Sequence, residues 1–414
     1  MDTTKTSRSW RSALAAGAVL AVAACGTTGA GGSGSDATPI TIMATSAVNS
    51  DLASLPQFFD VAKAYAEAVN AEGGINGHPI RITTCDNQAS PNPTVTCARQ
   101  AVTDKAVAVV GFAIVSPAFL KVLSDAKIPW VPGVARSPLE FSDPDSFPVT
   151  IGSSSTKIGA IALAAKTGCK TASVITNSNF LTQAEQVRDL AKAQDITIKI
   201  VTYPSNATDA APYAAQLAGS DCLLVGDTSD QFTAQLGVAL GQSGQKFRQI
   251  IGQGTLTTEL VSKNPAAWEG ALICGLVTDQ TTPPWAKFAD AVKRYVTTDQ
   301  AKHPAQQAQP TWVAMSVIGN TLRDLASQRK ELAPAGLQAA LNATTSANSD
   351  GTGAALDFTK TSPVPGSPRL FASEIAISLV RNGAVEPAFD GKYYTILPFL
   401  MGQKNTDPFF QERP

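Results

Sequence analysis

From Ile40 onward, short runs rich in β-branched residues alternate with longer stretches in which apolar residues recur every three or four positions. The first pattern predicts strands and the second predicts amphipathic helices. Regular alternation of the two is typical of βαβ units, which build a parallel sheet covered by helices. In the first part of the chain, strands are expected at residues 40–44, 80–84, 107–111 and 127–131.

Helix boundary signals separate these strands. Apolar side chains from Phe58 to Val69 follow a helical spacing, and Gly73-Gly74 ends that helix because glycine tolerates a positive φ. Asn92-Pro93 and Ser116-Pro117 are expected to cap the next two helices, since a polar cap followed by proline suits the first turn.

The same alternation restarts after a segment rich in proline and aspartate at residues 142–148. Strands are then expected at residues 172–176, 197–203, 222–226, 249–252 and 272–277, with helices at 182–194, 211–217 and 231–242. A last stretch carries helices at 285–296, 311–328 and 334–341 and extended segments at 355–358 and 373–380. Because that stretch cannot easily stand alone, we expect it to complete the two lobes. The predicted fold class is α/β, with two Rossmann-like lobes built on parallel sheets.

The N-terminus has the composition of an export signal. Basic residues precede an apolar stretch at residues 13–23, which is shorter than the ~20 residues that span a bilayer core. Val22-Ala23-Ala24-Cys25 resembles the bacterial lipobox, in which the cysteine sulfur accepts a diacylglyceryl group. We expect residues 1–24 to be a signal peptide, Cys25 to carry the lipid, and residues 25–37 to be a flexible tether. The alternative is an ordinary secretory signal with an incidental cysteine.

Composition argues against several functions. Lys and Arg total 32 and Asp and Glu total 33, and no basic stripe points to nucleic acid. The two histidines, His78 and His303, lie in Gly-His-Pro and Lys-His-Pro segments and are expected to be solvated. A Gly-x-Ser-x-Gly motif and a Cys/His cluster with zinc spacing are absent from the sequence, and no glycine-rich phosphate-binding motif follows a predicted strand. The sequence therefore predicts no enzyme, no metal and no cofactor.

One passage carries a specific resemblance. Residues 59–85, with the turn Asn70-Ala-Glu-Gly-Gly-Ile-Asn-Gly77, resemble the first helix, turn and second strand of type I periplasmic binding proteins, close to the leucine/isoleucine/valine-binding proteins of ABC importers. Weaker matches are Ala108-Val-Val-Gly111 before Ser116-Pro117, Ile128-Pro-Trp-Val-Pro-Gly133, Leu356-Asp-Phe-Thr359 and Val380-Arg-Asn-Gly383.

The resemblance implies a three-segment hinge, near Thr150-Ile151, at residues 278–281 and about Arg369, with ligand held between the lobes. The first lobe would then comprise residues 38–150 plus about 282–369, and the second lobe 151–281 plus 370–414.

In parallel sheets a ligand site lies beyond the carboxyl ends of the strands, which selects particular loops. The candidate ligand-binding residues in those loops are Ser46, Ser116, Ala135, Arg136, Phe180, Asp227, Thr228 and Gln253.

Several of these residues have a structural alternative. Ser116 is the family's serine for a ligand carboxylate, yet it could simply cap a helix. The guanidinium of Arg136 could hold a carboxylate or pair with Glu140 at the surface. Phe180 matches the family's aromatic cover or packs at a helix start. Asp227 and Asp230 could bind an ammonium, or Asp230 or Ser229 could simply cap the following helix.

A departure from the family bears on the ligand. Amino-acid binders of this family place an acidic residue near Gln253-Gly254, and this chain has none there. A buried cation without a partner is costly. Unless Asp227 takes the place of that acidic residue, the ligand is not expected to be an α-amino acid, and small amides, aromatic acids or other carboxylates are the alternatives.

Five cysteines remain after Cys25, so at least one is unpaired. Cys85 ends a strand and Cys97 lies in the next helix, which makes a bridge between them plausible. Cys169 and Cys222 precede strands that are neighbours in a 2-1-3 order, which makes a second bridge plausible, and Cys274 is expected to be a buried small side chain.

The expected function is a solute-binding lipoprotein on the outer face of the cytoplasmic membrane. As a monomer it would capture a small polar molecule by hinge closure and deliver it to an ABC permease. The alternative is a sensor that reports the ligand to a membrane receptor.

Overall fold

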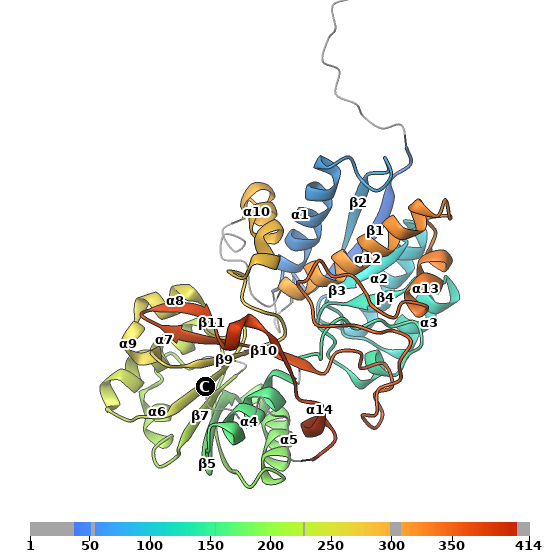
Figure 1. The fold of residues 1–414 in the computed structure, drawn as a ribbon. Helices are drawn as coiled ribbons and strands as arrows, with labels where there is room; N and C mark the ends of the chain where they lie inside the picture. The colour runs from blue at the N-terminus through green and yellow to red at the C-terminus, as the bar shows by residue number, and fades with distance from the viewer. Residues whose placement is uncertain (1–36, 51–53, 154, 227, 299–307, 404–414) are drawn as a thin grey trace, which may run out of the picture. The chain divides into compact units, whose positions relative to one another are not determined.

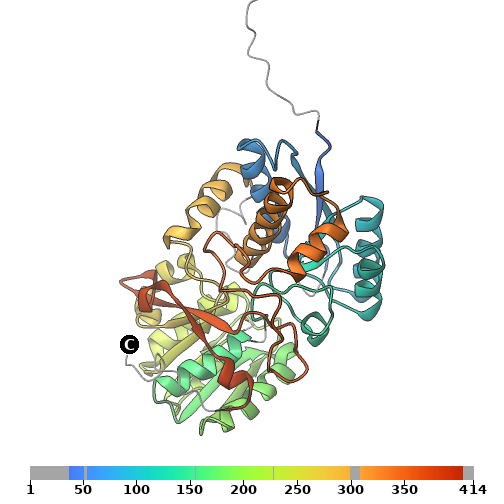
Figure 2. The same ribbon diagram turned by 45° about the vertical axis from the view of Figure 1, so that its right-hand side comes forward.

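Two sheets organise the chain in a computed structural model that describes residues 37–50, 54–153, 155–226, 228–298 and 308–403 (Figures 1 and 2). The first sheet is parallel throughout and has the order β2-β1-β3-β4. Its strands are β1 (Ile40–Ser46), β2 (Ile80–Asp86), β3 (Ala108–Gly111) and β4 (Trp130–Pro132). The 2-1-3 order places the carboxyl ends of β1 and β3 beside one another, which creates a crevice at that edge.

Helices cover both faces of the first sheet. One core contains residues of α1 (Gln57–Ala71), α10 (Ala286–Tyr295), α12 (Gln309–Ser327) and α13 (Pro334–Asn342). The core on the opposite face contains residues of α2 (Pro91–Thr103) and α3 (Pro117–Asp125). Figure 1 shows α1 and α10, far apart in the sequence, side by side. The late helices α10, α12 and α13 therefore pack into the core of the first lobe.

The second sheet has the order β11-β10-β9-β8-β7-β5-β6, with β12 paired to β10. Five strands are parallel: β5 (Thr171–Asn177), β6 (Thr197–Tyr203), β7 (Cys222–Val225), β8 (Arg248–Gly252) and β9 (Leu272–Gly275). The strands β10 (Glu374–Arg381), β11 (Ala384–Pro387) and β12 (Tyr393–Thr395) pair antiparallel at one edge. The antiparallel edge arises because Asn382 and Gly383 reverse the chain between β10 and β11.

The second sheet also has two covered faces. One core takes residues from α4 (Ser155–Lys166), α5 (Leu181–Lys192) and α14 (Leu397–Leu400). The other takes residues from α6 (Ala211–Gln216), α7 (Asp230–Ser243), α8 (Thr258–Lys263) and α9 (Pro265–Trp268). Short 3-10 turns lie at η1 (Pro138–Phe141), η2 (Ser178–Phe180), η3 (Pro283–Trp285) and η4 (Phe389–Gly391). Two helix-covered sheets in one chain confirm the predicted α/β fold class.

The glycine-containing turn after α1 has a clear physical basis. The Asn70 side chain bonds both backbone groups of Ile80, with its Oδ1 2.7 Å from Ile80 N and its Nδ2 2.9 Å from Ile80 O. Gly74 has a φ of +74°, and a Cβ there would collide with the carbonyl of His78. The motif thus fastens the end of α1 to the start of β2 within a turn that has no room for a side chain.

The chain passes between the two lobes three times. Val149 lies in the core of the first lobe and Ile151 in the core of the second. In the opposite direction, Leu276 lies in the core of the second lobe and Val277 in the core of the first. In the last passage Leu370 and Ile375 belong to the second core, and Ala372 between them belongs to the first. All three changes of core take place within a few residues, so the connecting segments are short.

Arg369 ties the last passage to the first. Its backbone N–H donates to Phe141 O at 2.8 Å, and its Nε donates to Ser146 O at 2.6 Å. The guanidinium carbon lies 4.5 Å from the ring centre of Phe147 and 4.8 Å from that of Phe371. Burial lowers the pKa of Arg369 to about 10, which leaves it cationic at neutral pH.

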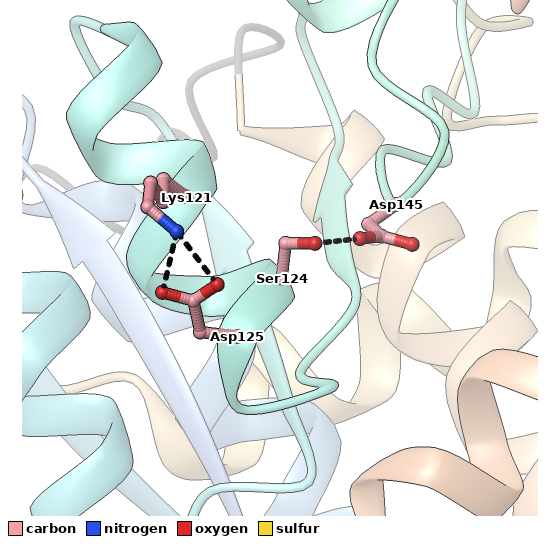
Figure 3. A network of polar contacts seen from close by, with 4 residues as sticks. All are labelled: Lys121, Ser124, Asp125 and Asp145. Atoms are coloured by element: carbon pink, nitrogen blue, oxygen red, sulfur yellow. Dashed lines mark hydrogen bonds and ion pairs between the residues drawn. The ribbon is translucent and has the colours of Figure 1, made fainter.

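A polar network in the first lobe fixes the segment that precedes the first passage. Figure 3 shows the Ser124 hydroxyl donating to Asp145, while Lys121 and Asp125 form an ion pair of 2.9 Å within α3. The Gln338 side chain of α13 donates to the other carboxylate oxygen of Asp145. The segment before the first passage is therefore fixed to both α3 and α13.

Several local predictions are corrected. The strand expected at residues 127–131 begins at Trp130, because Lys127 has a φ of +58° in the turn after α3. The helix expected to start at Asn92-Pro93 begins at Pro91. Residues 355–358 form no strand; their backbone bonds include Ala347 N to Leu356 O and Phe358 N to Thr344 O. Helix α4 was not predicted.

The structure joins Cys85 to Cys97 and Cys169 to Cys222, the pairs that the expected topology brings together, with Cα–Cα distances of 5.6 and 6.0 Å. Cys274 is buried without a disulfide partner.

Candidate ligand-binding pocket

One pocket receives residues from both lobes at the carboxyl ends of their strands. The first-lobe side contributes residues that follow β1, β3 and β4, namely Leu55, Phe58, Phe112, Val134 and Arg136. The second lobe contributes the start of α4 and the ends of β5, β7 and β8. The empty volume, which includes open solvent at the mouth, is about 1170 Å³.

The second-lobe lining has a polar part. Its members carry hydroxyl, amide or ammonium groups and are Ser153, Thr156, Lys157, Thr176, Thr228, Gln253 and Thr255. Ser153, Thr156 and Lys157 lie at the beginning of α4, where the helix dipole favours an anion. This part of the pocket suits a carboxylate.

The charge of the lining is positive. Among the described residues that line the pocket, Arg136 and Lys157 are the only charged ones. They come from different lobes. An α-ammonium finds no carboxylate among the described lining residues, in agreement with the departure from the family near Gln253.

The loop that carries Arg136 is fixed by Glu140. The carboxylate of Glu140 accepts hydrogen bonds from the backbone N–H groups of Arg136 at 2.8 Å and Ser137 at 2.9 Å, and from Trp130 Nε1 at 3.1 Å. Burial raises the pKa of Glu140 to about 7 despite these bonds. The alternative of a surface pair between Arg136 and Glu140 is wrong, because Glu140 is 1% exposed. The Arg136 guanidinium instead lies 4.9 Å from the ring centre of Phe112.

Phe180 lies next to the pocket rather than in its lining. The Lys157 ammonium is 5.8 Å from the centre of the half-buried Phe180 ring. Thr228 lines the pocket, and its hydroxyl pairs with that of Thr233 at 2.7 Å. Both predicted residues therefore lie at the second-lobe side of the site.

Gln253 lines the pocket and also holds the second passage between the lobes. Its Oε1 accepts from Leu276 N at 2.8 Å, and its Nε2 donates to Val277 O at 3.3 Å. The change of core occurs between those two residues. Gln253 therefore connects the pocket to a segment that links the lobes.

Three predicted residues are structural in this arrangement and do not line the pocket. The Ser46 hydroxyl donates to Leu55 O at 2.7 Å, and the Ser116 hydroxyl caps α3 by accepting from Phe119 N at 3.3 Å. Ala135 is buried, and its carbonyl accepts from Ser153 N at 2.9 Å. The capping alternative for Ser116 is thus observed.

Two predicted residues, Asp227 and the lipidation site Cys25, lie outside the described residues. His303, expected to be solvated, also lies outside them. His78 is half-buried in the turn before β2, with its Nδ1 2.9 Å from Thr38 O. Within the ranges the structure describes, no group of three His, Cys, Asp or Glu side chains is arranged to hold a metal ion.

Sequence reasoning missed Thr156, Lys157 and Ala160 of the second-lobe lining because it missed α4. A signal exists, since Ser153-Ser-Ser-Thr156 precedes the apolar run of residues 158–165, and a serine or threonine before an apolar run is a helix-start signature. Thr176 was expected as the end of a strand, with no role in the site.

The site and the two sheets define a two-lobed α/β binding protein with its pocket between the lobes. A family model described as periplasmic binding protein matches residues 39–365, and the chain belongs to this family. No curated protein matches the chain by sequence. Within the described residues, no helix is both long enough and apolar enough to cross a membrane.

Solved structures of low sequence identity share the fold. A branched-chain amino acid ABC transporter protein from Thermus thermophilus with bound valine has 14% identity and a TM-score of 0.71, over 88% of this chain and 98% of that chain. A solute-binding protein from R. palustris in complex with 4-hydroxybenzoate has 14% identity and a TM-score of 0.64, over 87% and 98%. A fatty acid ABC transporter substrate-binding protein from Thermomonospora curvata has 17% identity and a TM-score of 0.62, over 87% and 91%.

Proposed function

We propose that this protein is the solute-binding component of an ABC importer and that it captures a small carboxylate between its lobes. The observation that carries the proposal is the pocket's lining, in which Arg136 comes from one lobe and Lys157 from the other, with the first turn of α4 beside them. The similar structures that hold 4-hydroxybenzoate or belong to a fatty acid transporter support a carboxylate as the ligand class.

The mechanism is hinge closure. A ligand that contacts both lobes stabilises the state in which Arg136 and Lys157 are close together, and it shifts the population toward that state. The three short passages between the lobes, near residues 150, 277 and 373, provide the hinge. On this proposal the hinge divides the chain into lobes close to residues 38–150 plus 282–369 and 151–281 plus 370–414.

Calorimetric titration tests the ligand class with a soluble variant that begins at Asp36. We expect aliphatic and aromatic carboxylates to bind, and their neutral amides to bind at least tenfold more weakly, because an amide loses a charge-assisted hydrogen bond. Arg136→Gln should weaken carboxylate binding, whereas Arg99→Gln, a change at an exposed position on α2, should leave it unaltered. Equal binding of acids and amides would contradict the proposal.

A second measurement tests closure. The radius of gyration from solution scattering should fall when a binding carboxylate is added at saturation. An unchanged radius with a bound ligand would remove hinge closure from the mechanism.

The lipid anchor is part of the proposal, because a tethered binding protein stays within reach of its permease. Cells that express the full chain and are treated with globomycin should accumulate an unprocessed, larger form. Cys25→Ser should release the processed protein from the membrane fraction or block its processing. Normal processing and membrane retention of the serine variant would refute lipidation at Cys25.

A further inference from the structure

The pocket continues beyond its polar mouth into the second lobe. Its deeper lining is formed by buried side chains that otherwise belong to the core between the sheet and the helices α4 and α5, namely Ala160, Val174, Ala184, Val187 and Leu224. Each of these residues is less than 10% exposed. A cavity extension with an apolar lining is therefore built into the lobe itself.

The strand register defines the floor of this extension. Val174 of β5 and Leu224 of β7 are directly paired neighbours, and Thr176 lies two residues along β5 on the same face of the sheet. Two residues of a strand span about 6.6 Å, so the lining changes from hydroxyl to hydrocarbon over that depth. Thr176 marks the boundary.

Small residues provide the space. Ala160 of α4 and Ala184 of α5 face the extension, and Gly226 and Gly252 end the strands below it. A cavity lined by alkyl groups stays dry and accepts an apolar guest. The core of the second lobe thus contains room that its own side chains do not fill.

One polar atom in the lining lacks a partner. The Thr176 hydroxyl is buried and makes no hydrogen bond, although the residue is only 3% exposed. Buried hydroxyl groups are normally hydrogen-bonded, and an orphan at the wall of a cavity indicates a ligand atom at that point. The orphan lies between the cationic mouth and the apolar depth.

We infer that the ligand is an amphipathic monocarboxylate, whose carboxylate lies between Arg136 and Lys157 and accepts from Thr176, and whose alkyl or aryl tail occupies the slot between β5, β7, α4 and α5. We call this space the tail slot, and its lining residues are Ala160, Val174, Ala184, Val187 and Leu224. The inference rests on the proposed function, since it specifies which carboxylates that site takes. Burial of the tail inside one lobe also explains why the deep lining holds no charged group among the described residues.

The test is a titration series with straight-chain monocarboxylates from acetate to decanoate. We expect affinity to rise about fourfold with each methylene, the fold-change that corresponds to ~0.8 kcal/mol per buried CH₂, and then to level off when the slot is full. Affinity that does not depend on chain length would overturn the tail slot and leave the proposed carboxylate site standing. If no member of the series and no aromatic acid binds, the proposed function fails and the inference with it.

Two variants separate the tail from the head group. Ala184→Leu fills the slot, so it should abolish the gain with chain length, keep the affinity for short acids and leave the melting temperature unchanged or higher. Ala193→Leu, at an exposed position after α5, is the matched control and should bind like the wild type. A melting temperature that falls by several degrees in Ala184→Leu alone would show that the slot is not empty and would overturn the inference.

Thr176→Val replaces the orphan hydroxyl by a methyl of similar size. It should weaken every acid in the series by a similar factor, roughly tenfold, because the hydroxyl bonds the shared carboxylate. Unaltered affinity across the series would remove Thr176 from the head-group site.

Discussion

Protonation of Glu140 should control both the stability of the first lobe and the loop that carries Arg136. Glu140 is buried, and its carboxylate holds the backbone N–H groups of Arg136 and Ser137 together with the indole of Trp130. Burial raises its pKa from 4.5 to about 7, so the folded protein binds this proton more tightly than the unfolded chain does. The stability of the folded state must then depend on pH.

The sign and the size of the effect follow from that shift. The favourable contribution of the protonated carboxyl is fully present below pH 4.5 and is lost as the pH rises through about 7. The rise in the pKa of Glu140 from 4.5 to about 7 corresponds to a loss of about 3 kcal/mol in the free energy of unfolding across this window. Above pH 7 the contribution levels off.

Urea unfolding of the wild type and Glu140→Gln at pH 5, 6, 7 and 8 measures this difference. The amide cannot ionise, so the stability of the wild type relative to the variant should fall by about 3 kcal/mol from pH 5 to pH 8. A pH-independent loss of about 1 kcal/mol is expected in the variant, because one donor of the network loses its acceptor. Glu67→Gln, at an exposed position on α1, should follow the wild-type profile. Parallel profiles for the wild type and Glu140→Gln would refute the reasoning.

Other predictions concern the frame around the pocket. Gly133→Ala should destabilise the protein by about 2 kcal/mol or more, because a Cβ there would lie 2.6 Å from the backbone carbonyl carbon of Pro310; unchanged urea unfolding would contradict this close approach. Arg369→Met should cost about 2 kcal/mol in the same assay, since it removes the charged hydrogen bond between the first and third passages, and a loss below about 0.5 kcal/mol would assign that role elsewhere. The double change of Cys85 and Cys97 to serine should lower stability by about 3 kcal/mol, as expected for a bridge that closes a separation of 12 residues, and equal stability under oxidising conditions would show that this bridge does not form.

Periodic hydrophobic patterns were sufficient for the architecture because they record burial directly. The central parallel strands of both lobes are buried on two faces, so they appear in the sequence as short apolar runs, such as residues 222–225. The edge strands β11 and β12 are short and partly exposed, and they carry no such run. Helix α4 is buried on almost every side, so it lacks the polar face that makes α1 recognisable.

The residues of the candidate site also differ in how well the sequence predicts them. Arg136, Thr228 and Gln253 could be located from the sequence, because the rule that selects the carboxyl ends of parallel strands depends only on topology. Ser116 follows the same rule and yet caps a helix, since a hydroxyl at a strand end serves either purpose. Topology therefore predicts which loops surround the pocket, and the orientation of each side chain decides which residues face it.

The tail slot marks the limit of that approach. Its walls are alanine, valine and leucine at ordinary core positions, and nothing in their spacing distinguishes a filled core from a hollow one. The space is left because Ala160 and Ala184 are too small to fill the volume opposite Val174 and Leu224. These four residues come from four separate elements. The nature of the ligand tail is thus determined by packing between distant segments, whereas the nature of its head group is determined by a few charged residues whose loops the sequence reveals. Substitutions at the two alanines should change which carboxylates bind, while substitution of Arg136 should change whether any binds.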